Sequence, residues 1–304
     1  MTSLIKDRLA CLRAVVLRSE KVRHLKPFEG IQSVLRWHGL SRQLINRRLK
    51  ITTIDDHFDW IDVGRYGIAW PKGLPVSRLV GTLIELWVPS CSHFYFSAPS
   101  DMREGMHVVD VGASEGSFAL ECLKKGKAAD VWCFEPDSTL SSALQITAER
   151  NRLADRVHIV SAAVTKATGR VHSQENSADP SSYFRIEDLP VLEQKKLPYT
   201  LNAVPGISLD DWADQNAVQR LDFLKIDAEG SDFAVLQGAR NCLKRWHPSI
   251  AVTTYHHPDH CNEMIEYLAS LELNYRFKVR GVVAFNAVPR PVMLHAACSN
   301  LRST

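Results

Sequence analysis

The sequence predicts an α/β fold in which a mostly parallel sheet lies between two layers of helices. From residue 105 onward, short apolar segments alternate with segments whose apolar residues recur at helical spacing. The apolar segments are nearly continuous, as expected for strands that are covered on both faces. This alternation of strands and helices is typical of a parallel sheet sandwiched by helices. We expect seven strands, near residues 106–111, 131–135, 157–160, 222–227, 249–255, 274–280 and 291–297.

The chain before residue 105 differs in character, so we assign residues 1–104 to a basic N-terminal extension and residues 105–304 to the sheet domain. Residues 1–50 look helical and carry 12 Lys and Arg against 3 Asp and Glu, a net charge of +9; the remainder carries 25 against 31, a net of −6. A hairpin is expected at 58–63 and 66–70, and a helix at about 77–87. A basic arm can dock on an acidic partner or a membrane surface, with nucleic acid less favoured, although solvated basic helix faces are the simpler explanation of the charge.

Cysteine usage and hydropathy indicate a cytoplasmic protein without a transmembrane segment. The seven cysteines form no C-x-x-C pair, and several lie in apolar segments, which is typical of reduced, buried thiols. Charged residues interrupt the apolar run near the N-terminus, so no signal peptide is expected. The longest apolar candidate, 79–89, contains Glu85 and is far shorter than the ~20 residues that a membrane-spanning helix needs.

The most informative segment is 108–116, an apolar strand that runs into a glycine turn and then into a helix. Its two glycines allow a tight backbone and the close approach of a ligand. Strand–glycine–helix units bind cofactors at the carboxyl end of the strand. We therefore expect cofactor contacts from Asp110, Gly112, Ala113, Ser114 and Gly116.

A second acidic position indicates which cofactor is bound. Glu135 follows the second apolar strand, 25 residues after Asp110, where a carboxylate can accept both hydroxyls of a ribose, and Pro136 ends that strand. A dinucleotide would need the middle glycine of G-x-G-x-x-G and a phosphate at the helix N-terminus. That glycine is missing here, and Glu115 would place negative charge beside the phosphate. S-adenosylmethionine has no phosphate, so the pattern favours it over a nicotinamide cofactor.

These segments together resemble the FkbM family of S-adenosylmethionine-dependent methyltransferases, over roughly residues 105–285. The lysine–aspartate–glutamate–glycine block is the more specific part, because most methyltransferases share the glycine turn. Two departures are mild: Ser114 stands where many relatives have Asn, and Asp232 where Glu is frequent. The matching motifs, in order, are the glycine turn, 134–136, 162–164 before Gly169, 209–211, 221–232, 235–239 and 255–258.

The resemblance implies a class I (Rossmann-like) methyltransferase fold whose last strand runs antiparallel. It also implies an O-methyltransferase that uses S-adenosylmethionine and acts on a hydroxyl of a sugar, glycan or small secondary metabolite. By the same analogy, adenine packs beside Ser161 and Ala162. The strand end 227–230 lacks the N/D-P-P-Y turn of many amino-group methyltransferases, which also favours a hydroxyl acceptor.

Methyl transfer to a hydroxyl requires alignment and removal of a proton, by a general base or with the help of a metal. Asp227 ends the fourth strand, where ligands sit in open α/β sheets. It can act as the base, orient the acceptor, hold a metal or merely brace the loop. Lys225 precedes it by two residues and points to the same face, so a Lys225–Asp227 pair is expected. His257 is the third catalytic candidate. A divalent metal is not favoured; if one is bound, Asp227, His256 and His257 are its expected ligands.

Three other interpretations stay open. The basic arm could direct methylation of nucleic acid or protein, the cofactor-binding fold could be a non-catalytic scaffold, or the cofactor could be a nicotinamide. The stretch 165–206 breaks the rhythm of the chain, and its polar segment 174–182 reads as a loop. Such a loop could border the acceptor, although an ordinary hairpin insertion is an equal alternative.

Overall fold

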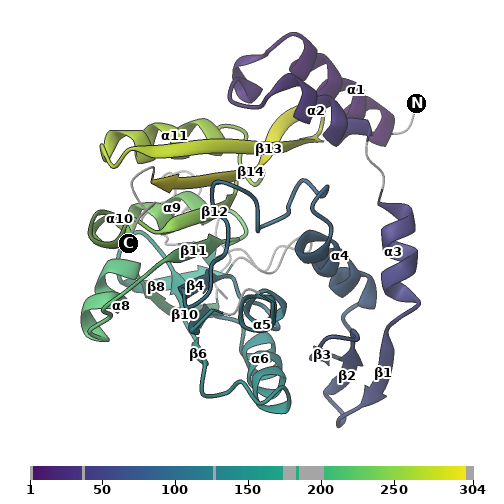
Figure 1. Ribbon diagram of the computed structural model, residues 1–304, viewed down its shortest axis with the longest axis vertical. Helices are drawn as coiled ribbons and strands as arrows, with labels where there is room; N and C mark the ends of the chain where they lie inside the picture. The colour runs from purple at the N-terminus through teal and green to yellow at the C-terminus, as the bar shows by residue number, and fades with distance from the viewer. Residues whose placement is uncertain (1–2, 36–37, 126–127, 174–182, 185–201, 299–304) are drawn as a thin grey trace.

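The computed structural model describes residues 3–35, 38–125, 128–173, 183–184 and 202–298. Its centre is a seven-stranded sheet in the order β13-β14-β12-β11-β4-β5-β6 (Figure 1). β14 is antiparallel to both of its neighbours, and the other pairs are parallel. The predicted mostly parallel α/β sheet is therefore confirmed. Its strands are β4 (His107–Val111), β5 (Asp130–Phe134), β6 (Val157–Val160), β11 (Phe223–Ile226), β12 (Ser249–Thr253), β13 (Tyr275–Phe285) and β14 (Val288–Cys298).

Two helical layers cover the sheet because successive strand residues point to opposite faces. Val109 and Val111 enter one hydrophobic core, and Val108 enters the other. The first core is closed by α8 (Leu209–Gln215), α9 (Asp232–Gln237), α10 (Arg240–Trp246) and α11 (His260–Ser270). The second is closed by α4 (Val76–Trp87), α5 (Ser117–Lys124) and α6 (Ser138–Arg150).

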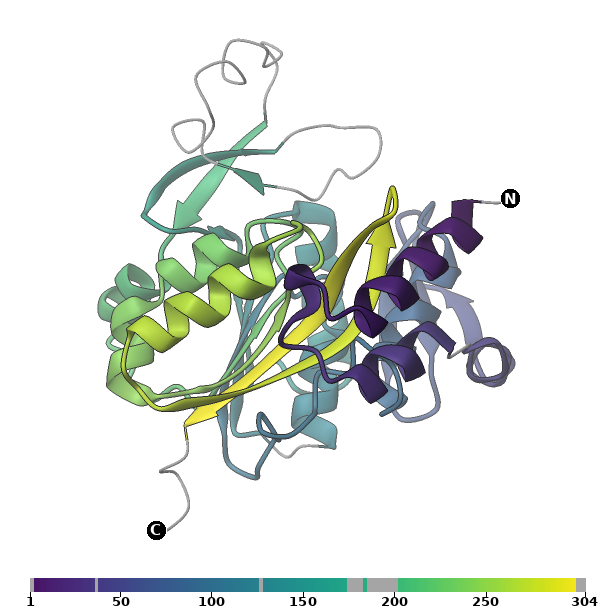
Figure 2. The ribbon, with the colours of Figure 1, turned by 90° about the horizontal axis from the view of Figure 1, so that it is seen from above.

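The N-terminal extension is helical at first, as predicted, and then forms a small sheet. Figures 1 and 2 show α1 and α2 side by side over β13 and β14. The predicted hairpin is present as β2 and β3. β1 was not expected, because all four of its residues are exposed and no apolar pattern marks it. The elements are α1 (Ser3–Val16), η1 (Glu20–Val22), α2 (Pro27–Leu35), α3 (Gly39–Asn46), β1 (Lys50–Thr53), β2 (Phe58–Asp62) and β3 (Gly67–Pro71).

The extension and the sheet domain share a hydrophobic core. Ile61 of β2 and Leu83 of α4 are fully buried in the same cluster as Val108 of β4. The helix α4 therefore lies against the sheet domain and can contribute side chains to any site at the ends of the central strands.

The stretch 165–206 contains a second sheet instead of a simple loop. Its strands pair in the order β7-β10-β8-β9, and β8 and β10 form an antiparallel pair, so an inserted hairpin describes this part better. The polar segment 174–182 lies outside the described residues. Among the residues that are described, no helix has the length and apolar character needed to cross a membrane. The strands are β7 (Ala163–Val164), β8 (Gly169–Ser173), β9 (Tyr183–Phe184) and β10 (Asn202–Ile207).

Candidate active site

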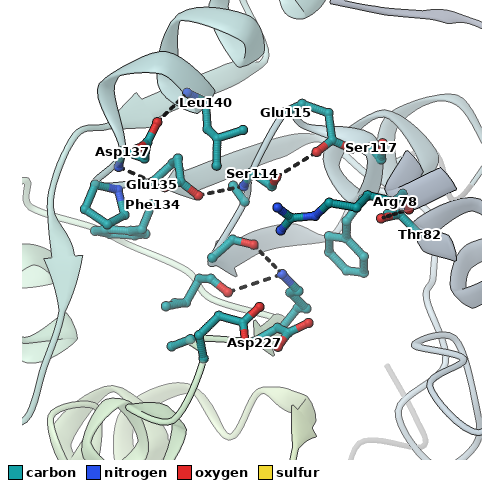
Figure 3. A pocket seen from close by; sticks show the side chains of 18 of the residues that line it. Arg78, Thr82, Ser114, Glu115, Ser117, Phe134, Glu135, Asp137, Leu140 and Asp227 are labelled. Atoms are coloured by element: carbon teal, nitrogen blue, oxygen red, sulfur yellow. Dashed lines mark hydrogen bonds between the residues drawn. The ribbon is translucent and has the colours of Figure 1, made fainter. Parts of the chain in front are cut away.

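A cavity of about 530 Å³ lies where β4, β5 and β11 end, at the edge where open α/β sheets bind ligands (Figure 3). Its walls come from the turn after β4, the end of β5, the turn after β11 and the helix α4. Of the residues expected to bind the cofactor, the cavity is lined by Gly112, Ala113, Ser114, Glu135, Pro136 and Ala162.

The glycine turn can form only because Gly112 lacks a side chain. Its φ is +75°, and a Cβ placed there would lie 1.9 Å from the carbonyl oxygen of Asp227. The amides of Gly112 and Ala113 both donate to the Phe134 carbonyl at 3.0 Å. These bonds fasten the turn to the end of β5, and the turn also lies directly against the Asp227 carbonyl at the end of β11, so that Glu135 and Asp227 border the same cavity.

Lys225 stabilises this turn from below. Its ammonium lies 2.9 Å from Oδ1 of Asp110 and donates to the carbonyls of Gly112 (2.7 Å) and Val111 (3.2 Å). Three contacts use all three of its protons. Burial alone would lower the pKa of Lys225, but Asp110 and Asp227 offset this and raise it, so the ammonium stays charged. Lys225 was expected to pair with Asp227; its partner is instead Asp110, which lies directly opposite it in the β4–β11 register.

Glu135 is buried at the end of β5 and faces the cavity. Its Oε2 accepts from the Ser114 amide at 2.8 Å, and its Oε1 accepts from the Asp137 amide at 2.9 Å. Each oxygen thus keeps a lone pair for a ligand hydroxyl. Burial raises the pKa of Glu135 to about 7, although the two amides favour the charged form. The arrangement suits a vicinal diol such as a ribose.

Glu115 gives the start of α5 a negative charge of its own. The side chain is buried against the protein, lines the cavity, and accepts from the hydroxyls of Ser114 (2.7 Å) and Ser117. A helix N-terminus usually attracts an anion. Here a carboxylate stands beside that position, so a pyrophosphate would meet like charge.

Asp227 leaves the end of β11 and lines the other half of the cavity. Its Oδ2 accepts from the Tyr95 hydroxyl at 2.7 Å, and its Oδ1 accepts from the Thr253 hydroxyl at 3.2 Å. Tyr95 is the main donor that orients this carboxylate, because the single proton of the Thr253 hydroxyl is shared with Oδ1 of Asp232, which lies closer at 2.9 Å. Burial and the nearby charge of Asp227 raise the pKa of Tyr95 well above its usual value, so Tyr95 remains a donor.

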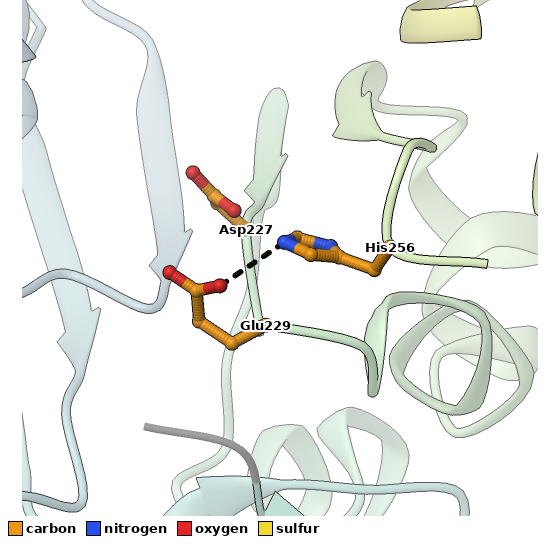
Figure 4. A group of neighbouring side chains, drawn as sticks. All are labelled: Asp227, Glu229 and His256. Carbon is orange, nitrogen blue, oxygen red and sulfur yellow. Dashed lines mark ion pairs between the residues drawn. The ribbon is translucent and has the colours of Figure 1, made fainter. Parts of the chain in front are cut away.

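Beside Asp227, Glu229 and His256 complete a group of three possible metal ligands whose atoms lie within 4.8 Å of one another (Figure 4). His256 is already paired on both ring nitrogens: Nε2 lies 3.1 Å from Glu229, and Nδ1 lies 2.8 Å from Asp232. Burial opposes its charge, but the two carboxylates outweigh this and raise the pKa of His256 to about 11. A metal would have to displace a tightly held proton, so the group fits an ion-pair network better than a metal centre.

Four of the residues predicted for cofactor binding or catalysis do not line the cavity, and neither does His256. Asp110 is fully buried beneath it, and Gly116 (φ +92°) starts α5, where a Cβ would lie 2.3 Å from the Leu144 side chain. Ser161 is exposed and within 3.2 Å of the Ser141 hydroxyl. His257 is exposed and contacts the ring of His260, whereas its neighbour His256 points to the carboxylates.

The sequence analysis missed a polar face of α4 that closes the cavity. Arg78, Thr82 and Glu85 all line it, and in Figure 3 the Arg78 side chain extends into the cavity. Burial and the charge of Asp227 raise the pKa of Glu85 to about 8, so its carboxyl is largely protonated at neutral pH. The spacing of four and three residues places these side chains on one helix face and was a readable signal.

The family model of the methyltransferase FkbM domain matches residues 110–277, which is more than half of the chain. The protein is therefore a member of the FkbM methyltransferase family, and the predicted resemblance is confirmed.

Among curated proteins, the chain is similar to the 2-O-methyltransferase NoeI of Sinorhizobium fredii (strain NBRC 101917 / NGR234), with 23% identity over 146 residues. That alignment covers 45% of this chain and 59% of NoeI, so the chain spans less than two thirds of its relative. Among solved structures, methyltransferase FkbM from Methylobacillus flagellatus KT has 18% identity and a TM-score of 0.47, covering 85% of this chain and 58% of the other. An O-methyltransferase from Bacillus cereus in complex with SAH has 13% identity and a TM-score of 0.38, covering 63% and 73%.

Proposed function

We propose that this protein is an S-adenosylmethionine-dependent O-methyltransferase whose acceptor is a hydroxyl of a sugar, a glycan or a small secondary metabolite. The observation that carries the proposal is the single cavity that contains the glycine turn, the Glu135 carboxyl and the Asp227 carboxylate. Membership in the FkbM family supports the reaction type. The name of NoeI, a 2-O-methyltransferase, supports oxygen as the acceptor atom.

In this proposal, the half of the cavity beside β4 and β5 holds the cofactor. Glu135 accepts the two ribose hydroxyls, and Ala162 borders the space expected for adenine. The backbone of the turn at Gly112 holds the amino-acid end, with Asp110 acting from beneath through Lys225. When bound, S-adenosylmethionine supplies an electrophilic methyl group on a sulfonium.

The half of the cavity beside α4 and Asp227 receives the acceptor. Asp227 takes the hydroxyl proton, because it is an oriented carboxylate at the end of β11. Glu85, largely protonated, donates to an acceptor oxygen or accepts from its hydroxyl. Lys225 is a positioning residue, since its protons are used by Asp110 and the glycine turn.

We propose that the reaction needs no divalent metal. The support is the geometry of His256, whose two ring nitrogens both face carboxylates, Glu229 at 3.1 Å and Asp232 at 2.8 Å. We also expect a reducing compartment such as the cytoplasm, because the seven cysteines are free thiols and six of them are buried.

The test is transfer of isotope-labelled methyl from S-adenosylmethionine to a panel of sugars, oligosaccharides and phenolic or aliphatic alcohols. We expect a product whose label survives alkali, as a methyl ether does and a methyl ester does not. Asp227→Asn, which keeps the shape of the side chain, should reduce product formation by at least about a hundredfold. Label found only on amines, on protein carboxyls or on RNA would overturn the proposed acceptor class.

A further inference from the structure

The outer surface of α1 and α2 is unusually apolar. Of the ten exposed large hydrophobic residues in the described part of the chain, nine lie within the first 51 residues. Scattered exposed apolar residues are ordinary, but a contiguous group indicates an interaction site. Six of the nine belong to α1, α2 and the residue that follows α1, namely Ile5, Leu9, Val16, Leu17, Phe28 and Leu35. We call their surface the α1–α2 face.

On α1, the exposed apolar residues lie opposite those that pack on the core. With about 100° per residue, Ile5, Leu9 and Val16 fall within about 40° of one another on the helix surface. Ala14 is buried on the other side, and Asp7 there accepts from the Ala287 amide between β13 and β14 at 2.8 Å. The helix therefore has one apolar side for the protein and a second apolar side that the fold does not use.

The helix α2 repeats this arrangement. Phe28 and Leu35 are seven residues apart, so they share one side of the helix, and they are 74% and 72% exposed. On the opposite side, Gly30 is buried, and the Ser33 hydroxyl accepts from the Val282 amide of β13 at 3.0 Å. Because both helices lie on the β13–β14 pair, their free sides point in the same direction, toward the viewer in Figure 2.

Basic side chains border these apolar residues. Lys21 and Arg23 nearby are paired with Asp259 and Glu266. By contrast, five exposed basic residues of the same segment take part in no ion pair among the described residues: Lys6, Arg8, Arg13, Arg18 and Lys26. The apolar stripe of α1 has basic residues on both sides: Lys6 and Arg13 lie along one edge of it, and Arg8 lies along the other.

We propose that the α1–α2 face docks this protein on a membrane surface that contains anionic lipids. Apolar side chains surrounded by unpaired Lys and Arg are the signature of helices that lie in the headgroup region. The apolar groups enter the acyl boundary, and the basic groups remain with lipid phosphates or carboxylates. Nucleic acid would use the charges but leave the aliphatic side chains in water. A symmetric dimer through this face would bring two basic sets together.

The test is co-sedimentation of the full chain with vesicles of phosphatidylcholine alone and with added phosphatidylglycerol. We expect binding to the anionic vesicles, and weakening of that binding by salt. Leu9→Ser and Phe28→Ser should each weaken this binding roughly tenfold, because each removes one apolar side chain that enters the membrane when the protein is bound. The matched control is Ile51→Ser, because Ile51 is also exposed and belongs to β1, a strand that Figure 1 shows far from α1 and α2. The double variant Arg8→Gln with Arg13→Gln should also weaken binding to the anionic vesicles. Its control is the double variant Arg240→Gln with Lys244→Gln on α10, which should bind them like the parent protein.

Absence of binding to anionic vesicles at low salt would overturn the proposal, as would binding that the apolar substitutions leave unchanged. A concentration-dependent dimer in the absence of lipid that Phe28→Ser abolishes would also overturn it, because a second copy would then cover the face. Thermal melting should be unchanged in all of these variants, since every substituted residue is exposed. Cofactor binding should also be unchanged, since none of these residues lines the cavity.

Discussion

Replacement of Lys225 by methionine should strongly destabilise the protein and loosen the cofactor turn. Met keeps most of the length of the side chain but removes the ammonium that lies 2.9 Å from the fully buried Asp110. Removal of one partner from a buried ion pair costs about 3–5 kcal/mol, because the other charge stays behind without compensation. The carbonyls of Gly112 and Val111 also lose their donor. We therefore expect a loss of about 3–5 kcal/mol in the free energy of unfolding.

Urea denaturation followed by circular dichroism measures this loss, provided that the unfolding is two-state. The matched control is Lys244→Met on α10, an exposed lysine, which should stay within about 0.5 kcal/mol of the parent protein. The double variant Asp110→Asn with Lys225→Met should be more stable than either single variant, because no charge is then left unpaired. A Lys225→Met protein as stable as the control would refute the account of this ion pair.

Four further predictions concern the cavity. Asp227→Asn should reduce turnover by at least about a hundredfold, the low end of a general base's contribution, and leave cofactor affinity nearly unchanged; equal losses in steady-state turnover and in calorimetric affinity would make Asp227 a cofactor ligand. Because burial raises the pKa of Glu135 from 4.5 to about 7 in the folded state, stability should fall as pH rises from about 4.5 to 7, and Glu135→Gln should flatten that slope in thermal melts; parallel slopes would count against it. Glu85→Gln should remove a transition near pH 8 from the turnover profile, which persists if Glu85 has no role. Exhaustive chelation should leave activity intact, whereas loss that Mg²⁺ or Mn²⁺ restores would place a metal at Asp227, Glu229 and His256.

The central sheet could be predicted because its strands are short apolar runs that end at recognisable turns. Covered strands and glycine turns are properties of consecutive residues, so the segment 108–116 carries the information for both. β1 carries no such information, because its four residues are exposed and it is held only by pairing with β2. The residues of such an edge strand do not indicate from their own sequence that a neighbouring strand will pair with them.

The site was predictable in part, for the same reason. Strand alternation placed Lys225 on the correct face, but its partner depends on the register between β11 and β4, which pairs it with Asp110. The register is set by tertiary packing rather than by either strand alone. The adjacent residues His256 and His257 are alike in sequence, and only the path of the chain after β12 decides that His256 meets the carboxylates.

The contribution of α4 was missed because this helix precedes residues 110–277, the part of the chain that the family model matches. Arg78, Thr82 and Glu85 share a helix face, but that face could equally have been solvated. What makes it part of the site is the packing of Leu83 into the core shared with β4. This contact joins residues far apart in the chain, so the spacing on α4 indicates that the three side chains share a face but not that this face borders a cavity.

The most direct test of the central claim is calorimetric titration of the purified protein with S-adenosylhomocysteine, the demethylated cofactor. The account predicts saturable binding at one site per chain. Glu135→Ala should weaken that binding several-fold or more, and Glu149→Ala, an exposed carboxylate at the end of α6, should not. Absence of binding to the parent protein, or an affinity that Glu135→Ala leaves unchanged, would contradict the claim that the ends of β4 and β5 jointly hold an adenosyl group.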